Sequence, residues 1–193
     1  MGKLSRCTIA EYIRLEETAV DKHEYRDGEI LSMSGGSPRH SLVISNFIGK
    51  TWSVLKGKPC RVYESNLRVR VARSMLYTYP DASIVCGPLQ YDANDTSQTT
   101  IINPKVIVEV LSPGSETYDR GDKFDRYRMI DSLEEYILIR QSQPSVHTFL
   151  RQPEGNWSFA WFDGLEAVLK IRSIGIDLPL SDIYSSVEFD LAV

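Results

Sequence analysis

Hydrophobic residues between positions 38 and 56 recur at roughly helical spacing, which predicts an amphipathic helix. Ser37 is suited to cap its first turn, Pro38 to stand at the first helical position, and Gly57 to end it. The apolar positions that carry this pattern are Leu42, Ile44, Phe47, Ile48, Trp52 and Leu55.

Two shorter elements are expected before this helix. Thr8 and Glu11 have the spacing of a capping box, which predicts a short helix that runs through about Glu17. Asp27 and Gly28 stand between two short alternating runs. Because both central residues of the favoured two-residue turn need positive φ, this dipeptide predicts a β-hairpin.

Three apolar segments in the middle of the chain predict strands: RVYESNLRVRV (61–71), DASIVCG (81–87) and KVIVEVLS (105–112). The third has no polar alternation, as expected for a strand buried on both faces of a partly parallel sheet. A helix from about Thr117 to Ile130 is expected to follow.

The rest of the chain predicts further strands. EEYILIR and SVHTFLRQ form a hairpin across SQPS, NWSFAWFDG is another strand, and residues 168–184 combine a strand with a short closing helix. The order of elements predicts an α/β (α+β) fold with a mixed central sheet flanked by helices. With 193 residues, the chain is expected to form a single domain, 1–193.

Composition narrows the class of protein. No apolar leader or run of about 18 apolar residues is present, so we expect a soluble, cytoplasmic protein with no membrane partner. The three scattered cysteines predict reduced thiols. The net charge of −4 argues against tight non-specific binding to nucleic acid. Arg68 and Arg70 would share a strand face and could form a local basic surface, although ordinary solvated charge is the preferred explanation for each of them.

One carboxylate in the third strand needs an explanation. Glu109 interrupts a run of apolar residues, where an unpaired charge would cost several kcal/mol. Asp81 begins the preceding strand, and Lys123 is expected on the helix that follows. Two carboxylates near the ends of adjacent strands could hold a divalent cation, and a nearby lysine could orient water and neutralise developing charge.

Simpler explanations exist for most of these residues. Asp81 alone could be a turn acid, and Glu24 in the first hairpin could be a surface charge. Asp119 and Lys123 could form an ordinary ion pair four residues apart, and Tyr127, on the same helix face, could simply pack its ring. His40 could contact phosphate or transfer a proton, but a lone histidine is more often structural.

Taken together, the motifs resemble those of the PD-(D/E)XK nuclease superfamily, and more closely the bacterial restriction endonuclease-like family of the Uma-two type. The residues that carry the resemblance are Pro80-Asp81, the run from Glu109 to Pro113, and the series Asp119, Lys123 and Tyr127. The wider superfamily has its lysine where this chain has Leu111, whereas this family carries it on the next helix, at the place of Lys123.

The resemblance implies a restriction endonuclease-like fold and a Mg²⁺ or Mn²⁺ ion held by Asp81, Glu109 and the Val110 carbonyl. It also implies catalysis by Lys123 with support from Glu24 and Tyr127. The expected function is therefore metal-dependent endonucleolytic hydrolysis of DNA, by a homodimer if both strands are cut.

Two rival functions stay open. The first is a non-catalytic nucleic-acid-binding or assembly module on the same fold, and the second is an enzyme that acts on a small phosphoester. Nucleotide-binding and zinc-protease motifs are absent from the sequence.

Overall fold

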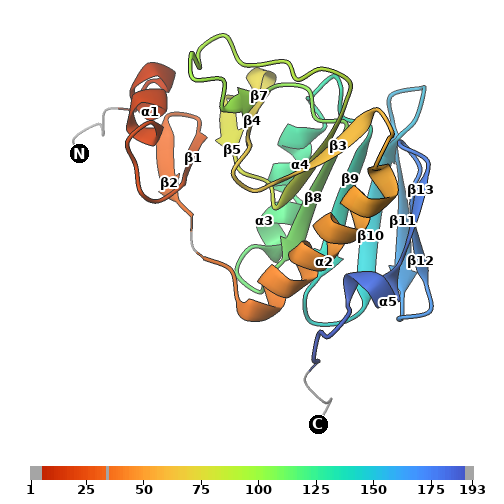
Figure 1. The fold of residues 1–193 in the computed structure, drawn as a ribbon. Helices are drawn as coiled ribbons and strands as arrows, with labels where there is room; N and C mark the ends of the chain where they lie inside the picture. Colours follow the sequence, from red (N-terminus) through yellow and green to blue (C-terminus); the bar gives the residue numbers. More distant parts are fainter. Residues whose placement is uncertain (1–5, 34, 190–193) are drawn as a thin grey trace.

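The computed structural model describes residues 6–33 and 35–189, and it contains both helices and strands (Figure 1). A short 3₁₀ turn lies at Ala72–Ser74. The α-helices are α1 (Ile9–Glu16), α2 (Pro38–Leu55), α3 (Glu116–Arg120), α4 (Asp122–Tyr127) and α5 (Leu180–Ile183).

The largest sheet has six strands in the order β11-β10-β9-β8-β6-β3. β8 lies near its middle, parallel to β9 and antiparallel to β6, and all six of its residues are buried. The mixed sheet predicted from the sequence is therefore confirmed. Its strands are β3 (Cys60–Glu64), β6 (Ala82–Cys86), β8 (Val106–Leu111), β9 (Glu135–Arg140), β10 (Ser145–Arg151) and β11 (Trp157–Asp163).

Two smaller sheets accompany it. A five-stranded sheet in the order β2-β1-β5-β4-β7 is built on the first hairpin, and β12 (Val168–Ile171) pairs with β13 (Ile176–Pro179). The strands of the five-stranded sheet are β1 (His23–Arg26), β2 (Glu29–Ser32), β4 (Arg68–Val71), β5 (Leu76–Thr78) and β7 (Thr100–Ile101).

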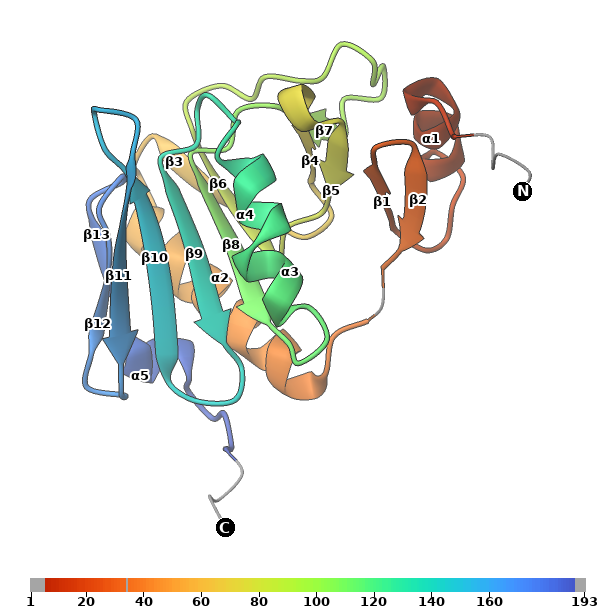
Figure 2. The ribbon, with the colours of Figure 1, turned by 180° about the vertical axis from the view of Figure 1, so that it is seen from behind.

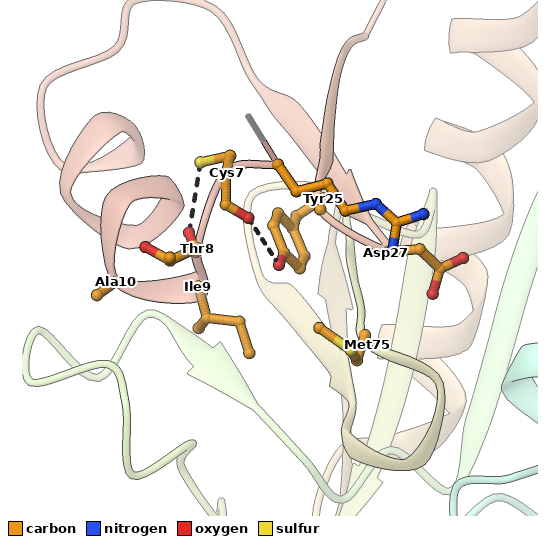
Figure 3. Close-up of a pocket in the computed structure, with 9 residues that line it drawn as sticks. Cys7, Thr8, Ile9, Ala10, Tyr25, Asp27 and Met75 are labelled. Atoms are coloured by element: carbon orange, nitrogen blue, oxygen red, sulfur yellow. Dashed lines mark hydrogen bonds between the residues drawn. The ribbon is translucent and has the colours of Figure 1, made fainter. Parts of the chain in front are cut away.

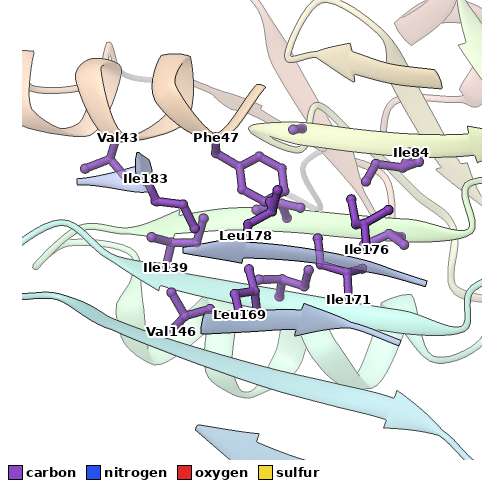
Figure 4. Packing of buried hydrophobic residues seen from close by; sticks show 14 of the residues in the cluster. Val43, Phe47, Ile84, Ile139, Val146, Leu169, Ile171, Ile176, Leu178 and Ile183 are labelled. Atoms are coloured by element: carbon purple, nitrogen blue, oxygen red, sulfur yellow. The ribbon is translucent and has the colours of Figure 1, made fainter. Parts of the chain in front are cut away.

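The six-stranded sheet is covered differently on its two faces. α2, α5 and the β12–β13 hairpin lie against one face, and α3 and α4 lie against the other (Figures 1 and 2). Even-numbered residues of β8 join the core under α2, which also contains Phe47, Leu169 and Ile183 (Figure 4). Odd-numbered residues of β8 face α4, because Ile107 and Leu111 share a second core with Tyr127.

Several local predictions are confirmed. Thr8 and Glu11 form the reciprocal capping box of α1, and Ser37 caps α2 by accepting from the amide of His40. Asp27 and Gly28 have φ values of 52° and 94°, as the predicted hairpin turn requires.

Three predicted boundaries are wrong. Residues 61–71 form two strands, β3 and β4, in different sheets, because a turn closed by the Leu67 amide and the Glu64 carbonyl redirects the chain. The helix expected from Thr117 to Ile130 is two short helices that meet at Gly121. Residues 168–184 contain a hairpin rather than one strand before α5.

The predictions for cysteine and arginine also need correction. Cys60 and Cys86 lie opposite each other on β3 and β6 and form a disulfide, so they are not reduced thiols. Arg68 is buried and its guanidinium lies 3.2 Å from a carboxylate oxygen of Asp95, so it contributes to neither a basic surface nor solvated charge. No helix in residues 6–33 and 35–189 is long and apolar enough to cross a membrane.

Candidate active site

Asp81 and Glu109 meet because β6 and β8 are antiparallel neighbours. Ala82 pairs with Val108, and one further residue of this register places Asp81 opposite Glu109. An oxygen of Asp81 accepts a hydrogen bond from the Val110 amide at 2.7 Å. The Asp81 side chain is 21% exposed, so this carboxylate stands at the solvent edge of the pair.

Glu109 is only 4% exposed, and its carboxylate is held from two sides. The Tyr127 hydroxyl donates to it at 2.7 Å, and the Lys123 ammonium lies 2.9 Å away. These contacts offset the cost of placing a carboxylate in a buried strand. Tyr127 is fully buried, so it both packs its ring and contacts the acid.

Lys123 is buried among three carboxylates from three different elements. Its Nζ atom lies 2.9 Å from Glu109 on β8, 3.5 Å from Glu24 on β1 and 3.5 Å from Asp119 on α3. Glu24 also accepts a hydrogen bond from the Thr78 hydroxyl on β5. The first hairpin therefore brings Glu24 beside Lys123, and the catalytic role of Glu24, implied by the resemblance, stays a prediction.

The break between α3 and α4 shapes this cluster. Gly121 ends α3 with a φ of −111° and a ψ of −101°, which is not helical. A side chain at this position would place its Cβ 3.3 Å from the Thr117 carbonyl oxygen, a tight contact that glycine avoids. Asp119 and Lys123 nevertheless remain an ion pair across the break.

The pKa values in the cluster depend on burial and on the excess of carboxylates over the single Lys123 ammonium. Burial raises the pKa of Glu109 to about 8, against the opposing effect of Lys123, while Asp81 and Asp119 raise it further. Burial likewise raises the pKa of Asp119. Burial alone would lower the pKa of Lys123, but the surrounding acids outweigh it and raise that pKa well above the ordinary value.

His40, in the first turn of α2, also reaches the site. Its Nε2 atom lies 3.1 Å from the Asp81 carboxylate. The hydrogen bond to Asp81 raises the pKa of His40 despite the opposing effect of burial. Nothing in the sequence paired these residues, because their contact depends on how α2 docks beside β6.

The donor set fits a magnesium ion. Within residues 6–33 and 35–189, no three His, Cys, Asp or Glu side chains are gathered as a ready metal-binding group. Mg²⁺ needs fewer protein ligands than such a group provides, since it keeps several waters and is bound through one or two carboxylates. Asp81 and Glu109 can supply these, since Asp81 lies opposite Glu109 and the ammonium is already shared by three acids, Glu24, Glu109 and Asp119.

The site does not coincide with the large cavity at the amino-terminal end of the fold. That cavity has a volume of about 770 Å³ and includes Cys7, Ile9, Tyr25 and Met75 in its lining (Figure 3). Tyr25 and Glu24 are adjacent on β1 and point to opposite faces of the hairpin. The acids therefore lie on the other side of β1.

The mixed sheet, flanked by helices, defines a restriction endonuclease-like fold. It is shared by a crystal structure from Anabaena variabilis of a protein described as "a putative nuclease belonging to DUF820". The two have a TM-score of 0.71 at 20% sequence identity, over 92% of this chain and 99% of that one.

Sequence comparison gives the family. The profile of the Uma2 family, described as "Putative restriction endonuclease", matches residues 9–181. Two Synechocystis proteins, both named uncharacterized, are similar along most of their length. The protein slr1290 is 33% identical over 93% of this chain and 92% of its own chain. The protein sll1609 is 32% identical over 88% of this chain and 94% of its own chain. The chain belongs to the Uma2 family.

Proposed function

We propose that the protein is a metal-dependent endonuclease that hydrolyses phosphodiester bonds in DNA. The observation that carries the proposal is the convergence of three carboxylates on one buried ammonium, with Asp81 at the solvent edge opposite Glu109. A surface that only bound the negative DNA backbone would not be expected to bury three acids. The family's description as a restriction endonuclease supports the same activity.

Asp81, Glu109 and the Val110 carbonyl would hold Mg²⁺ or Mn²⁺, which when bound would supply a positive charge beside the scissile phosphate and acidify a water. Lys123 would orient the attacking water and stabilise charge on the phosphoryl oxygens. Glu24 and Tyr127 would hold Lys123 and Glu109 in place, because each contacts one of them directly.

A cleavage assay tests the activity. Purified protein should nick plasmid DNA in the presence of Mg²⁺ or Mn²⁺. This cleavage should be lost when EDTA is added and in the Lys123→Ala variant. Lys105→Ala is the matched control, because Lys105 forms an ion pair at the surface, away from these acids. Cleavage that persists in Lys123→Ala would contradict the assigned role, and inactivity of the wild type on DNA and RNA with every metal would favour the non-catalytic binding or assembly module.

Calorimetric titration tests the metal site. Wild-type protein should bind about one Mn²⁺ ion per chain through its two carboxylates. Asp81→Asn and Glu109→Gln should each abolish this binding, whereas Asp131→Asn should leave it unchanged, because the Asp131 side chain is largely exposed and pairs only with Arg73 among the charged groups of the described chain. Unchanged binding in either site variant would remove the metal from the proposal.

We further propose that residues 1–193 act as one nuclease-like domain in the cytoplasm. Cleavage of both strands of a duplex would require two sites, which a homodimer provides.

A further inference from the structure

A group of cations and exposed aromatic rings lies on the same face of the sheet as Glu109, on the other side of α3. In the pairing of β8 to β11, Glu109, Leu138, His147 and Trp161 form one row. Because neighbouring strands are about 4.8 Å apart, three steps place the backbone of Trp161 roughly 14 Å from that of Glu109. α4 reaches β10 and the start of β11 through Phe124, whose ring contacts Phe149 and Trp157. No helix of the described residues lies in front of the rest of β11 (Figure 2).

Two guanidinium groups in this region share one carboxylate. Arg120 on α3 and Arg140 at the end of β9 lie 2.8 and 2.9 Å from the same Glu116 oxygen. Arg120 also contacts the His147 ring, yet its buried Nη2 atom has no hydrogen-bond partner among the described residues. This guanidinium therefore has donor capacity that the protein does not satisfy.

The cations adjoin the proposed catalytic acids. Arg120 directly follows Asp119, and Arg140 pairs with Leu111, two residues beyond Glu109 on the neighbouring strand. Burial, Arg120 and Arg140 lower the pKa of His147, and these outweigh the opposing effects of Asp163 and Glu116. Two guanidinium groups thus share one paired carboxylate here, although the whole chain is acidic.

The aromatic part of the group is unusually exposed. Trp161 is 62% exposed and Phe159 is 47% exposed, with their ring centroids 5.6 Å apart. The Phe159 and His147 rings are perpendicular, with centroids 5.3 Å apart, and His147 in turn contacts Arg120. Exposed aromatic rings beside cations are the usual means of binding an unpaired nucleic-acid strand, because bases stack on the rings while phosphates meet the cations.

We propose that Arg120, Arg140, Phe159 and Trp161 form a subsite for the single-stranded part of a nucleic-acid substrate, with an unpaired base stacked on Trp161. The inference rests on the proposed nuclease function and adds a substrate class: strands with single-stranded or frayed ends beside the scissile phosphate. A second copy of this chain is the competing occupant of the aromatic face, and the tests below separate the two.

The first experiment measures binding without cleavage. Wild-type protein in EDTA is titrated against a fluorescein-labelled single strand of about 16 nucleotides and against a blunt duplex of the same length. Trp161→Ala should weaken binding of the single strand by ~10-fold or more and leave binding of the duplex nearly unchanged. Trp52→Ala is the matched control, because Trp52 is 58% exposed on α2, across the sheet.

Two further variants separate stacking from charge. Trp161→Phe keeps an aromatic face and should retain most of the binding. Arg140→Gln should weaken single-strand binding and reduce its dependence on salt by about one phosphate contact. In a Trp52→Phe background, the single strand should quench tryptophan fluorescence, and Trp161→Phe should remove most of that quenching.

The outcomes distinguish this subsite from the nuclease activity. Equal single-strand affinity in wild type, Trp161→Ala and Trp52→Ala would overturn the subsite even if the protein cleaves DNA. Specific loss in Trp161→Ala would support it even in a protein that never cleaves. Unchanged affinity together with a change from dimer to monomer in Trp161→Ala, measured by light scattering, would assign the aromatic face to a second copy instead.

Discussion

Replacing Lys123 with methionine tests the electrostatics of the site independently of catalysis. The substitution keeps an unbranched side chain of similar length but leaves Glu24, Glu109 and Asp119 buried without their shared ammonium. Removal of one partner from a buried ion pair typically costs about 3–5 kcal/mol. For a chain of this size, that corresponds to a fall in melting temperature of roughly 6–20 °C.

The loss should depend on pH. The pKa of Glu109 is about 8 and that of Asp119 is also raised, so between the ordinary carboxyl pKa and these values the folded state binds more protons than the unfolded chain. The free energy of unfolding therefore falls as pH rises through this window. Without Lys123 both pKa values rise further, so the deficit should grow as pH rises through about 8, be larger at pH 9, and shrink to about 1–2 kcal/mol at pH 5, where the acids are protonated in both proteins.

Thermal and urea unfolding in EDTA at the two pH values measure this effect. Lys105→Met is the control, because Lys105 pairs with Glu134 at a half-exposed position and should lose less than about 1 kcal/mol. A Lys123→Met deficit that is equal at both pH values would refute the reasoning, and so would a deficit no larger than that of Lys105→Met.

Two further predictions concern the displaced lysine and the disulfide. Leu111 packs in the same core as Tyr127, on the strand face that carries Glu109. Lys123→Ala should slow single-turnover cleavage by ~10²-fold, and adding Leu111→Lys to this variant should recover part of the loss. A folded double variant that is no faster than Lys123→Ala would contradict this prediction. Thiol titration of the unfolded, unreduced protein should find one free thiol, Cys7, and Cys60→Ser should lower stability by about 3 kcal/mol. Three free thiols would exclude the disulfide.

The catalytic candidates on β8 and α4 could be predicted because their signals are local. An acid in an apolar strand needs a partner, and Tyr127 follows Glu109 by 18 residues, on a short helix that packs against the same strand and also carries Lys123. The unexpected break at Gly121 did not separate Asp119 from Lys123, since the two short helices keep this pair in contact.

Contacts between distant segments could not be predicted in this way. His40 and Asp81 are separated by 41 residues, and Cys60 meets Cys86 only because β3 and β6 are neighbours. Strand order decides both contacts, and a single sequence does not specify it. Arg68 looked like a surface charge for the same reason, since its partner Asp95 lies in a distant loop.

The core under α2 also determines when the protein can fold during its synthesis. Val43 and Phe47 on α2 are made well before Leu178 and Ile183, with which they pack (Figure 4). Folding that depends on contacts so distant in sequence is slow and must wait until β13 and α5 have been made. While the ribosome still holds β13 and α5, the apolar face of α2 lacks part of its cover, so a growing chain needs protection from aggregation until α5 emerges.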